Sequence, residues 1–194
     1  MEDGKRNTKE AIIQTAQKLF AKFGMRKTAV DEIAEKAHVS KGSIYHHFRD
    51  KEDIFRSVIR REGETLIAKI WEEISKQANP QDKLQAMMKT KIFHYRNLVN
   101  LWEVSREMVE ELLPSVEKER KRIWQEEKRM IARILQEGVE EKVFTLPDIN
   151  MVAESIVSAF RNLEFSWTLE MNEKEFEMKL DSLLNILFKG LEAR

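Results

Sequence analysis

The run from Lys41 to His47, with the sequence KGSIYHH, gathers side chains that could recognise a regular polyanion. It supplies a cation, two hydroxyl groups and two imidazoles, all of which can hydrogen-bond. Glycine inside a helix costs up to about 1 kcal/mol relative to alanine, so close approach to a base or a sugar would explain Gly42. The major groove of DNA admits a helix with a small or hydrogen-bonding face. The predicted chemistry is therefore hydrogen bonding to base edges and phosphates.

The residues of this run divide by side when they are placed on a helix. Ile44 and the following Phe48 are apolar and are expected to pack inward. Tyr45 and His47 are expected to flank the groove, where the hydroxyl and imidazole groups reach phosphates. The residues expected to face the groove are Lys41, Gly42, Ser43 and His46.

Two helices are predicted before this run. Apolar residues at the i, i+3, i+4 spacing indicate an amphipathic helix over residues 8–23, and Gly24 follows its end. Thr28 and Asp31 resemble a capping box and predict that a second helix begins there. Its N-terminus would offer free backbone N–H groups to a phosphate.

The run itself and the helix after it also carry start signals. Ser40 is expected to cap a short helix over 41–47, and Asp50 with Asp53 is expected to start a helix that runs to about Gln77. Lys51 adds a positive charge to the first turn of that helix. Helix, tight turn and second helix in this order predict a helix-turn-helix, in which one helix braces another in the groove.

The remaining sequence predicts further helices and no strand. The expected ranges are 81–111, 114–142, 148–170 and 173–191. The chain is therefore predicted to be all-α, with about nine helices.

Composition limits the possible function. Residues 1–60 carry 13 Lys and Arg against 9 Asp and Glu, and the remainder carries 21 against 25. A basic N-terminal third is a modest indication of a nucleic-acid partner, although ordinary variation in charge gives the same asymmetry. The chain has no Cys, which excludes disulfides and thiolate metal sites. It has no apolar run long enough to span a membrane, so we expect a soluble, cytoplasmic protein.

Four motifs occur in order near the N-terminus: A-x-x-L-F-A-K-x-G at 16–24, T-x-V-D-E-I-A-E-K-A at 28–37, V-S-K-G-S-I-Y-H-H-F at 39–48 and D-K-E-D-I-F at 50–55. Together they resemble the DNA-binding domain of the tetracycline-repressor (TetR) family, over about a quarter of the chain. The family usually has Gly where this chain has His38. A left-handed turn at that position would leave His38 slightly strained.

The resemblance implies a transcriptional regulator, most often a repressor, that binds a palindromic operator in double-stranded DNA as a homodimer. It implies a helix-turn-helix domain over 1–50 and a helical ligand-binding and dimerisation domain over 51–194. It also implies release by a small hydrophobic effector, such as a fatty acyl thioester or an aromatic compound, with no cofactor. The phosphate contacts that it implies are Thr28, Tyr45, His47 and Lys51.

The last two predicted helices, 148–170 and 173–191, each carry a long apolar stripe. Two adjacent helices of this kind could pack against a symmetry mate as a four-helix bundle. The alternative is that both stripes belong to the core of one protomer. We expect dimerisation through these helices, because a palindrome needs two recognition helices about one turn of DNA apart.

An effector pocket in the helical body would be mostly apolar with a few placed polar groups. For any single aromatic residue, packing in the core is the alternative role. The candidate pocket residues are Phe93, Arg96, Asn97, Trp102, Trp124, Arg161, Asn162, Phe165 and Trp167.

Two other function classes are alternatives to a transcriptional regulator. An enzyme has little support, because the sequence contains no nucleophile elbow, Gly-rich phosphate loop or His-Glu-x-x-His motif. His46 and His47 are consecutive, so on a helix they point about 100° apart and are poorly placed to share a metal. We therefore expect no catalytic and no metal-binding residues. A helical adaptor that has lost DNA binding is the other alternative.

Overall fold

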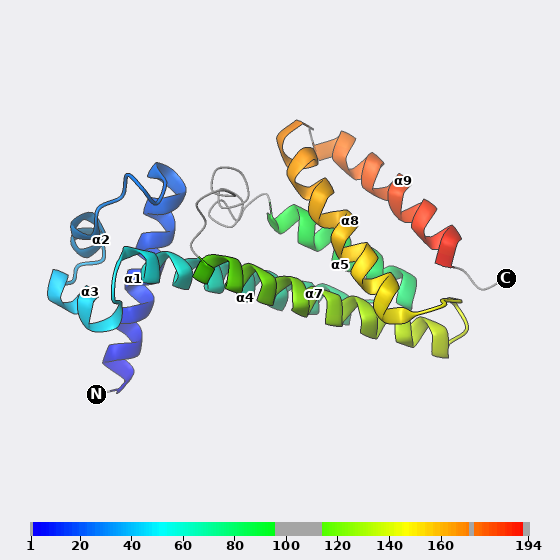
Figure 1. Ribbon diagram of the computed structural model, residues 1–194, viewed down its shortest axis with the longest axis horizontal. Coiled ribbons are helices and arrows are strands. Elements are labelled where there is room, and N and C mark those ends of the chain that lie inside the picture. The colour runs from blue at the N-terminus through cyan, green and yellow to red at the C-terminus, as the bar shows by residue number, and fades with distance from the viewer. Residues whose placement is uncertain (1, 96–113, 171–172, 192–194) are drawn as a thin grey trace. The chain divides into compact units, whose positions relative to one another are not determined.

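The computed structural model describes residues 2–95, 114–170 and 173–191, and every regular element in these ranges is an α-helix (Figure 1). The prediction of an all-α chain is confirmed. The helices are α1 (Glu2–Phe23), α2 (Val30–Lys36), α3 (Lys41–His47), α4 (Lys51–Ser75), α5 (Pro80–Tyr95), α7 (Pro114–Glu140), α8 (Ile149–Glu170) and α9 (Glu173–Leu191).

The described residues divide into two compact units. The first unit holds the chain as far as Gly63 together with the start of α7 as far as Arg120. The second holds Glu64 to the end of α5 and the chain from Lys121 onward. Both boundaries fall inside helices, so α4 and α7 each contribute residues to both units.

The core of the first unit forms where α1, α2 and α3 pack on one another (Figure 1). Ile12 and Phe20 of α1 and Ile33 of α2 are completely buried. Phe20 also packs edge-on against Phe55 of α4, with the ring centroids 5.3 Å apart. The apolar face predicted for residues 8–23 is therefore the face that builds this core, although α1 begins earlier, at Glu2.

The start of α2 differs from the prediction. The N-cap residue is Ala29, whose backbone N–H donates to the Glu32 carboxylate at 2.9 Å. Thr28 does not cap the helix, because its hydroxyl donates to the carbonyl oxygen of Gly24 at 2.9 Å. Gly24 has a φ of 77°, in the left-handed region, which ends α1 and turns the chain toward this bond.

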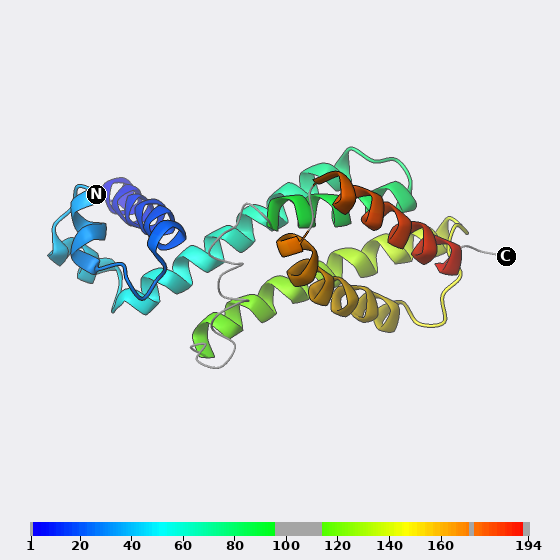
Figure 2. The same cartoon turned by 90° about the horizontal axis from the view of Figure 1, so that it is seen from above.

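The second unit contains the later parts of α4 and α7 together with α5, α8 and α9. Figure 2 shows α5 and α9 side by side, and the Lys89 ammonium lies 2.8 Å from Asp181 across this contact. Lys91 of α5 and Glu127 of α7 form an ion pair at 2.8 Å. Both residues are buried, so charge as well as apolar packing joins these two helices.

Helix α7 ends at Glu140, slightly before the predicted end near Lys142. The carbonyl oxygen of Gly138 accepts the N–H groups of Val143 at 2.8 Å and Phe144 at 3.0 Å, and Lys142 has a φ of 60°. This left-handed residue stops the helix and places the buried Phe144 ring over Gly138. Among the described helices, none is long and apolar enough to cross a membrane.

Candidate nucleic-acid interface

Helix α3 is only seven residues long, so packing and capping must hold it in place. The Ser40 hydroxyl oxygen accepts the Ser43 N–H at 3.0 Å, which confirms the predicted cap. Ile44 and Phe48 are 1% and 3% exposed, which confirms that this side of the helix faces the core. The helix is therefore capped at its start and packed against α1 and α2.

The opposite side of α3 is at the surface. Lys41, Gly42 and His46 are exposed, and Tyr45 is 50% exposed. Ser43 and His47 are half-buried, with the Ser43 hydroxyl 2.9 Å from that of Ser40. The structure therefore presents the predicted groove face as one continuous outer side of the helix.

Lys41 is held by a partner that sequence reasoning missed. Its ammonium lies 2.7 Å from the Asp31 carboxylate in the first turn of α2, and both side chains are largely exposed. The hydrogen bond and charge of Asp31 raise the pKa of Lys41 above its usual value. Asp31 lies in the first turn of one helix of the helix-turn-helix, and Lys41 lies in the first turn of the other. These two positions are the only feature of the sequence that could have indicated the ion pair.

Gly42 has open space around it. A Cβ added there would meet only the Ser40 hydroxyl oxygen, at 3.7 Å, which is an ordinary van der Waals distance. The packing of the chain therefore gives no reason for glycine at this position. An external surface that approaches α3 closely does give one.

The turn between α2 and α3 is left-handed at His38, which has a φ of 56°. This confirms the predicted turn and its mild strain, since residues other than glycine seldom adopt this region. The turn is fixed by the Val39 N–H, which donates to the carbonyl oxygen of Ala34 at 3.0 Å.

Thr28 and Lys51 meet inside the first unit. The Lys51 ammonium donates to the carbonyl oxygens of Thr28 at 3.0 Å and Arg26 at 3.2 Å, which ties α4 to the loop before α2. Thr28 is 1% exposed, and its N–H and hydroxyl both donate to Gly24. We therefore remove Thr28 from the predicted phosphate contacts, because its donors are used within the domain.

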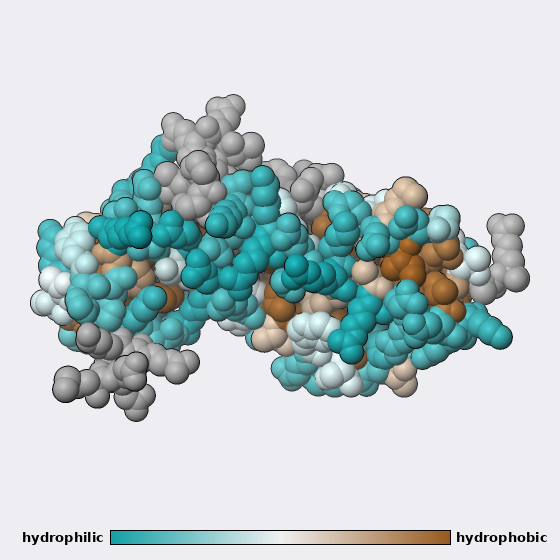
Figure 3. Space-filling view, turned by 60° about the horizontal axis from the view of Figure 1, so that its bottom comes forward, coloured by the Kyte–Doolittle hydropathy of each residue, from teal (hydrophilic) through white to brown (hydrophobic). Residues whose placement is uncertain are grey.

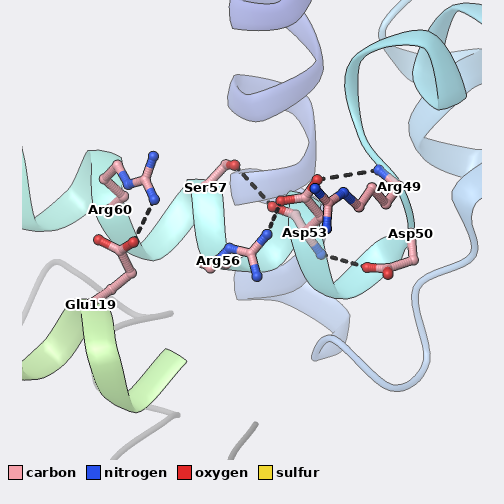
Figure 4. Close-up of polar contacts among 7 residues, drawn as sticks. All are labelled: Arg49, Asp50, Asp53, Arg56, Ser57, Arg60 and Glu119. Carbon is pink, nitrogen blue, oxygen red and sulfur yellow. Dashed lines mark hydrogen bonds and ion pairs between the residues drawn. The ribbon is translucent and has the colours of Figure 1, made fainter. Parts of the chain in front are cut away.

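The start of α4 is built as predicted (Figure 4). The Asp50 carboxylate accepts the Asp53 N–H at 2.7 Å, and the Asp53 carboxylate accepts the Arg49 N–H at 3.2 Å. Burial acts to raise the pKa of Asp53, but the Arg49 N–H and the Arg56 guanidinium outweigh it and lower the pKa. The same helix holds Arg60, which pairs with Glu119 of α7 (Figure 4).

The predicted effector residues are only partly within the described structure. Trp124 lines a cavity between α7 and α8, whereas Phe93 is 54% exposed and is not part of that lining. The residues outside the described positions are Arg96, Asn97 and Trp102. The side chains of four α8 residues also lie outside the described part: Arg161, Asn162, Phe165 and Trp167. The effector pocket stays a prediction.

The described side chains form no metal site. No group of three or more His, Asp or Glu residues in these ranges is placed to hold an ion. What this unit does present is a short, capped and well-anchored helix whose outer side carries hydrogen-bonding groups.

Comparison with known proteins agrees with this geometry. Residues 12–58 match the family model for bacterial regulatory proteins of the tetR family. The HTH-type transcriptional repressor KstR2 of Mycobacterium tuberculosis is 26% identical over 144 residues, which are 72% of this chain and 70% of the relative. The fatty acid metabolism regulator protein of Bacillus subtilis is 23% identical over 186 residues, which are 94% of this chain and 95% of the relative.

Solved structures show the same fold. A transcriptional regulator from Cytophaga hutchinsonii is 25% identical with a TM-score of 0.79, and the match covers 95% of this chain and 98% of that one. FadR from Bacillus subtilis, in complex with stearoyl-CoA, is 23% identical with a TM-score of 0.75, and the match covers 93% of this chain and 98% of FadR. These relatives regulate transcription and are not enzymes. The motifs, the helix-turn-helix and the family model thus identify residues 12–58 as a DNA-binding domain of the tetracycline-repressor (TetR) family of bacterial transcriptional regulators.

Proposed function

We propose that the protein is a homodimeric cytoplasmic repressor that binds a palindromic operator and is released by a long-chain fatty acyl thioester. The observation that carries the DNA-binding part is the division of α3 into two sides. Ile44 is buried, while Lys41, Tyr45 and His46 are exposed. A helix anchored on one side and hydrogen-bonding on the other suits the major groove.

Each outer residue of α3 has a role in the proposed complex. Tyr45 and His47 flank the groove and contact phosphates, and Lys51 joins them at the first turn of α4. Two of the ammonium N–H groups of Lys51 hold the loop before α2, and the third can donate to a phosphate. The residues assigned to the groove are Lys41, Gly42, Ser43 and His46.

Exposed apolar side chains on the last two helices support the proposed dimer. Met151 of α8 is 59% exposed, and Met178 and Ile186 of α9 are 58% and 67% exposed. Figure 3 shows that one face of the second unit carries apolar surface. Large apolar side chains in water favour association, and a twofold interface on α8 and α9 would cover them.

Similarity over nearly the whole chain supports the effector class. The structure of FadR from Bacillus subtilis in complex with stearoyl-CoA matches 93% of this chain, and the fatty acid metabolism regulator protein of that organism matches 94% of it. We therefore prefer a fatty acyl thioester to an aromatic compound as the effector. Such a ligand could act only by binding more tightly to the dimer whose α3 helices are wrongly spaced for the operator.

Helix α4 is the proposed connection between the two functions. We assign residues 1–50 to the DNA-binding domain and 51–194 to the regulatory domain. Helix α4 begins with Lys51, which contacts the loop before α2, and continues past Gly63 into the second unit. A change in the second unit that moves α4 would therefore move the anchor of the helix-turn-helix.

A binding assay with selected DNA tests the DNA-binding part. We expect selection from a random duplex library to yield a palindrome whose affinity falls steeply with salt, because phosphate contacts release counterions. Tyr45→Phe should weaken binding to this palindrome and to unrelated duplex alike, without a change in thermal stability, because it removes one exposed hydroxyl group. Equal affinities of Tyr45→Phe and the wild type at two salt concentrations would refute the proposed docking.

The effector is tested on the same complex. Stearoyl-CoA should release the wild-type protein from the selected palindrome. A complex that persists at saturating stearoyl-CoA would contradict the effector class and leave the DNA-binding proposal intact.

A further inference from the structure

The second unit contains a cavity between α7 and α8 that the proposed DNA contacts do not use. Its volume is about 330 Å³, within the range of roughly 300–1,000 Å³ that is usual for small-molecule sites. Its lining combines exposed residues with the buried Val157. The lining includes Lys121, Trp124, Gln125, Lys128, Val157 and Ser158.

Cations outnumber carboxylates in this lining. Lys121 and Lys128 come from α7, and Glu154 of α8 supplies the one carboxylate. The Lys128 ammonium lies 2.6 Å from Glu154, so this ion pair joins α7 to α8 at the cavity wall. Because the lining carries a net positive charge, the cavity favours an anionic ligand.

The same cavity contains an aromatic surface. Trp124 is half-buried in the lining, one helical turn after Lys121 and one before Lys128. Residues three and four apart share one side of a helix, so an aromatic face lies between two cations. A nucleobase stacks on aromatic side chains, and lysine binds phosphate.

We propose that this cavity binds the phosphorylated adenine nucleotide portion of an acyl-coenzyme A effector, which rests on the effector class of the proposed function. Trp124 stacks on the adenine, and Lys121 and Lys128 bind the phosphates. The polar lining is unsuited to a long acyl chain, which lies outside this cavity. As Lys128 turns to a phosphate its ion pair with Glu154 weakens, so binding alters the connection between α7 and α8.

Calorimetric titration of the full-length protein separates the nucleotide from the acyl chain. The three probes are stearoyl-CoA, free coenzyme A and stearoyl-pantetheine, a thioester without the nucleotide. Lys121→Ala and Trp124→Leu alter the cavity, and Lys118→Ala is the matched control, an exposed lysine on the same helix outside the lining. Thermal unfolding of each variant shows that it is folded.

We expect Lys121→Ala to weaken stearoyl-CoA binding about tenfold, the loss typical of one hydrogen bond between charged groups. Its affinity for stearoyl-pantetheine should equal that of the wild type, and Lys118→Ala should bind all probes normally. Trp124→Leu should behave as Lys121→Ala does, and free coenzyme A should bind more weakly than stearoyl-CoA but with the same dependence on Lys121.

Three results would overturn the inference. If both cavity variants bind stearoyl-CoA as the wild type does, the nucleotide lies elsewhere while the effector class stands. If the cavity variants lose equal affinity for stearoyl-CoA and for stearoyl-pantetheine, the cavity does not recognise the nucleotide. Failure of the wild type to bind either thioester would remove the effector class as well.

Discussion

Gly42→Ala should affect the stability of α3 and its affinity for DNA in opposite directions. A Cβ at this position meets only the Ser40 hydroxyl oxygen, at 3.7 Å, so no side chain has to move. Alanine is favoured over glycine in a helix by up to about 1 kcal/mol. Gly42 lies in the first turn, so we expect a gain of about 0.5 kcal/mol and a rise in melting temperature of about 1–2 °C.

The same methyl group should be unfavourable on DNA. Gly42 lies on the exposed outer side of α3, where a base or sugar is proposed to approach the backbone. A methyl group that holds the helix away from the groove weakens several contacts together, and we expect at least about a tenfold loss of affinity, or about 1.4 kcal/mol. The assays are thermal unfolding without DNA and fluorescence anisotropy with the selected palindrome.

Gln136→Ala is the control for this substitution. Gln136 is an exposed residue of α7, outside α3 and outside the helices of the proposed dimer. Its substitution should leave DNA affinity unchanged. If Gly42→Ala binds DNA as tightly as the wild type does, α3 does not approach DNA closely at this residue. If its melting temperature falls, the space around Gly42 is too small for a methyl group.

Three further outcomes concern stability. A Cβ at Gly138 would overlap the Phe144 ring, so Gly138→Ala should lower the free energy of unfolding in urea by about 1–3 kcal/mol. The double variant Gly138→Ala with Phe144→Leu should recover part of this loss. Equal stability of the wild type and both variants would contradict this packing. Lys91→Met leaves the buried Glu127 carboxylate without its cation and should lower the free energy of unfolding by about 3–5 kcal/mol. The double variant Lys91→Met with Glu127→Leu should have a stability close to that of the wild type. A double variant that loses the sum of the two single losses would argue against a buried ion pair. Because the pKa of Asp53 is lower in the folded protein, its carboxylate stabilises the fold at pH values above the ordinary pKa of 3.8. This stability is lost as the pH falls through the lower pKa of the folded state. Asp53→Asn should therefore make the melting temperature depend less steeply on pH in the acid range.

Local signals made much of the helix-turn-helix predictable. Ser40 and Asp50 each satisfy backbone donors within three residues, so these helix starts depend on near neighbours alone. The inward side of α3 followed from the 3.6-residue period, and the left-handed turn at His38 from a position where the family has glycine.

Contacts between helices were not predictable in the same way. Periodicity shows which side of a helix is apolar but not which side chain on another helix it meets. The ion pairs of Lys41 with Asp31 and of Lys91 with Glu127 therefore emerged only from the structure. Thr28 was assigned to a cap by its sequence context, yet its hydroxyl found a closer acceptor in Gly24, at the end of the preceding helix.

One measurement tests the central claim most directly: selection of duplex DNA by the wild-type protein, followed by anisotropy of the selected sequence with and without stearoyl-CoA. The proposed repressor should select a palindrome whose half-sites lie about one helical turn apart, roughly 34–36 Å. Binding should weaken as salt rises, and stearoyl-CoA should release the DNA. Enrichment of no sequence, together with an affinity that does not depend on salt, would contradict operator binding and favour a helical adaptor.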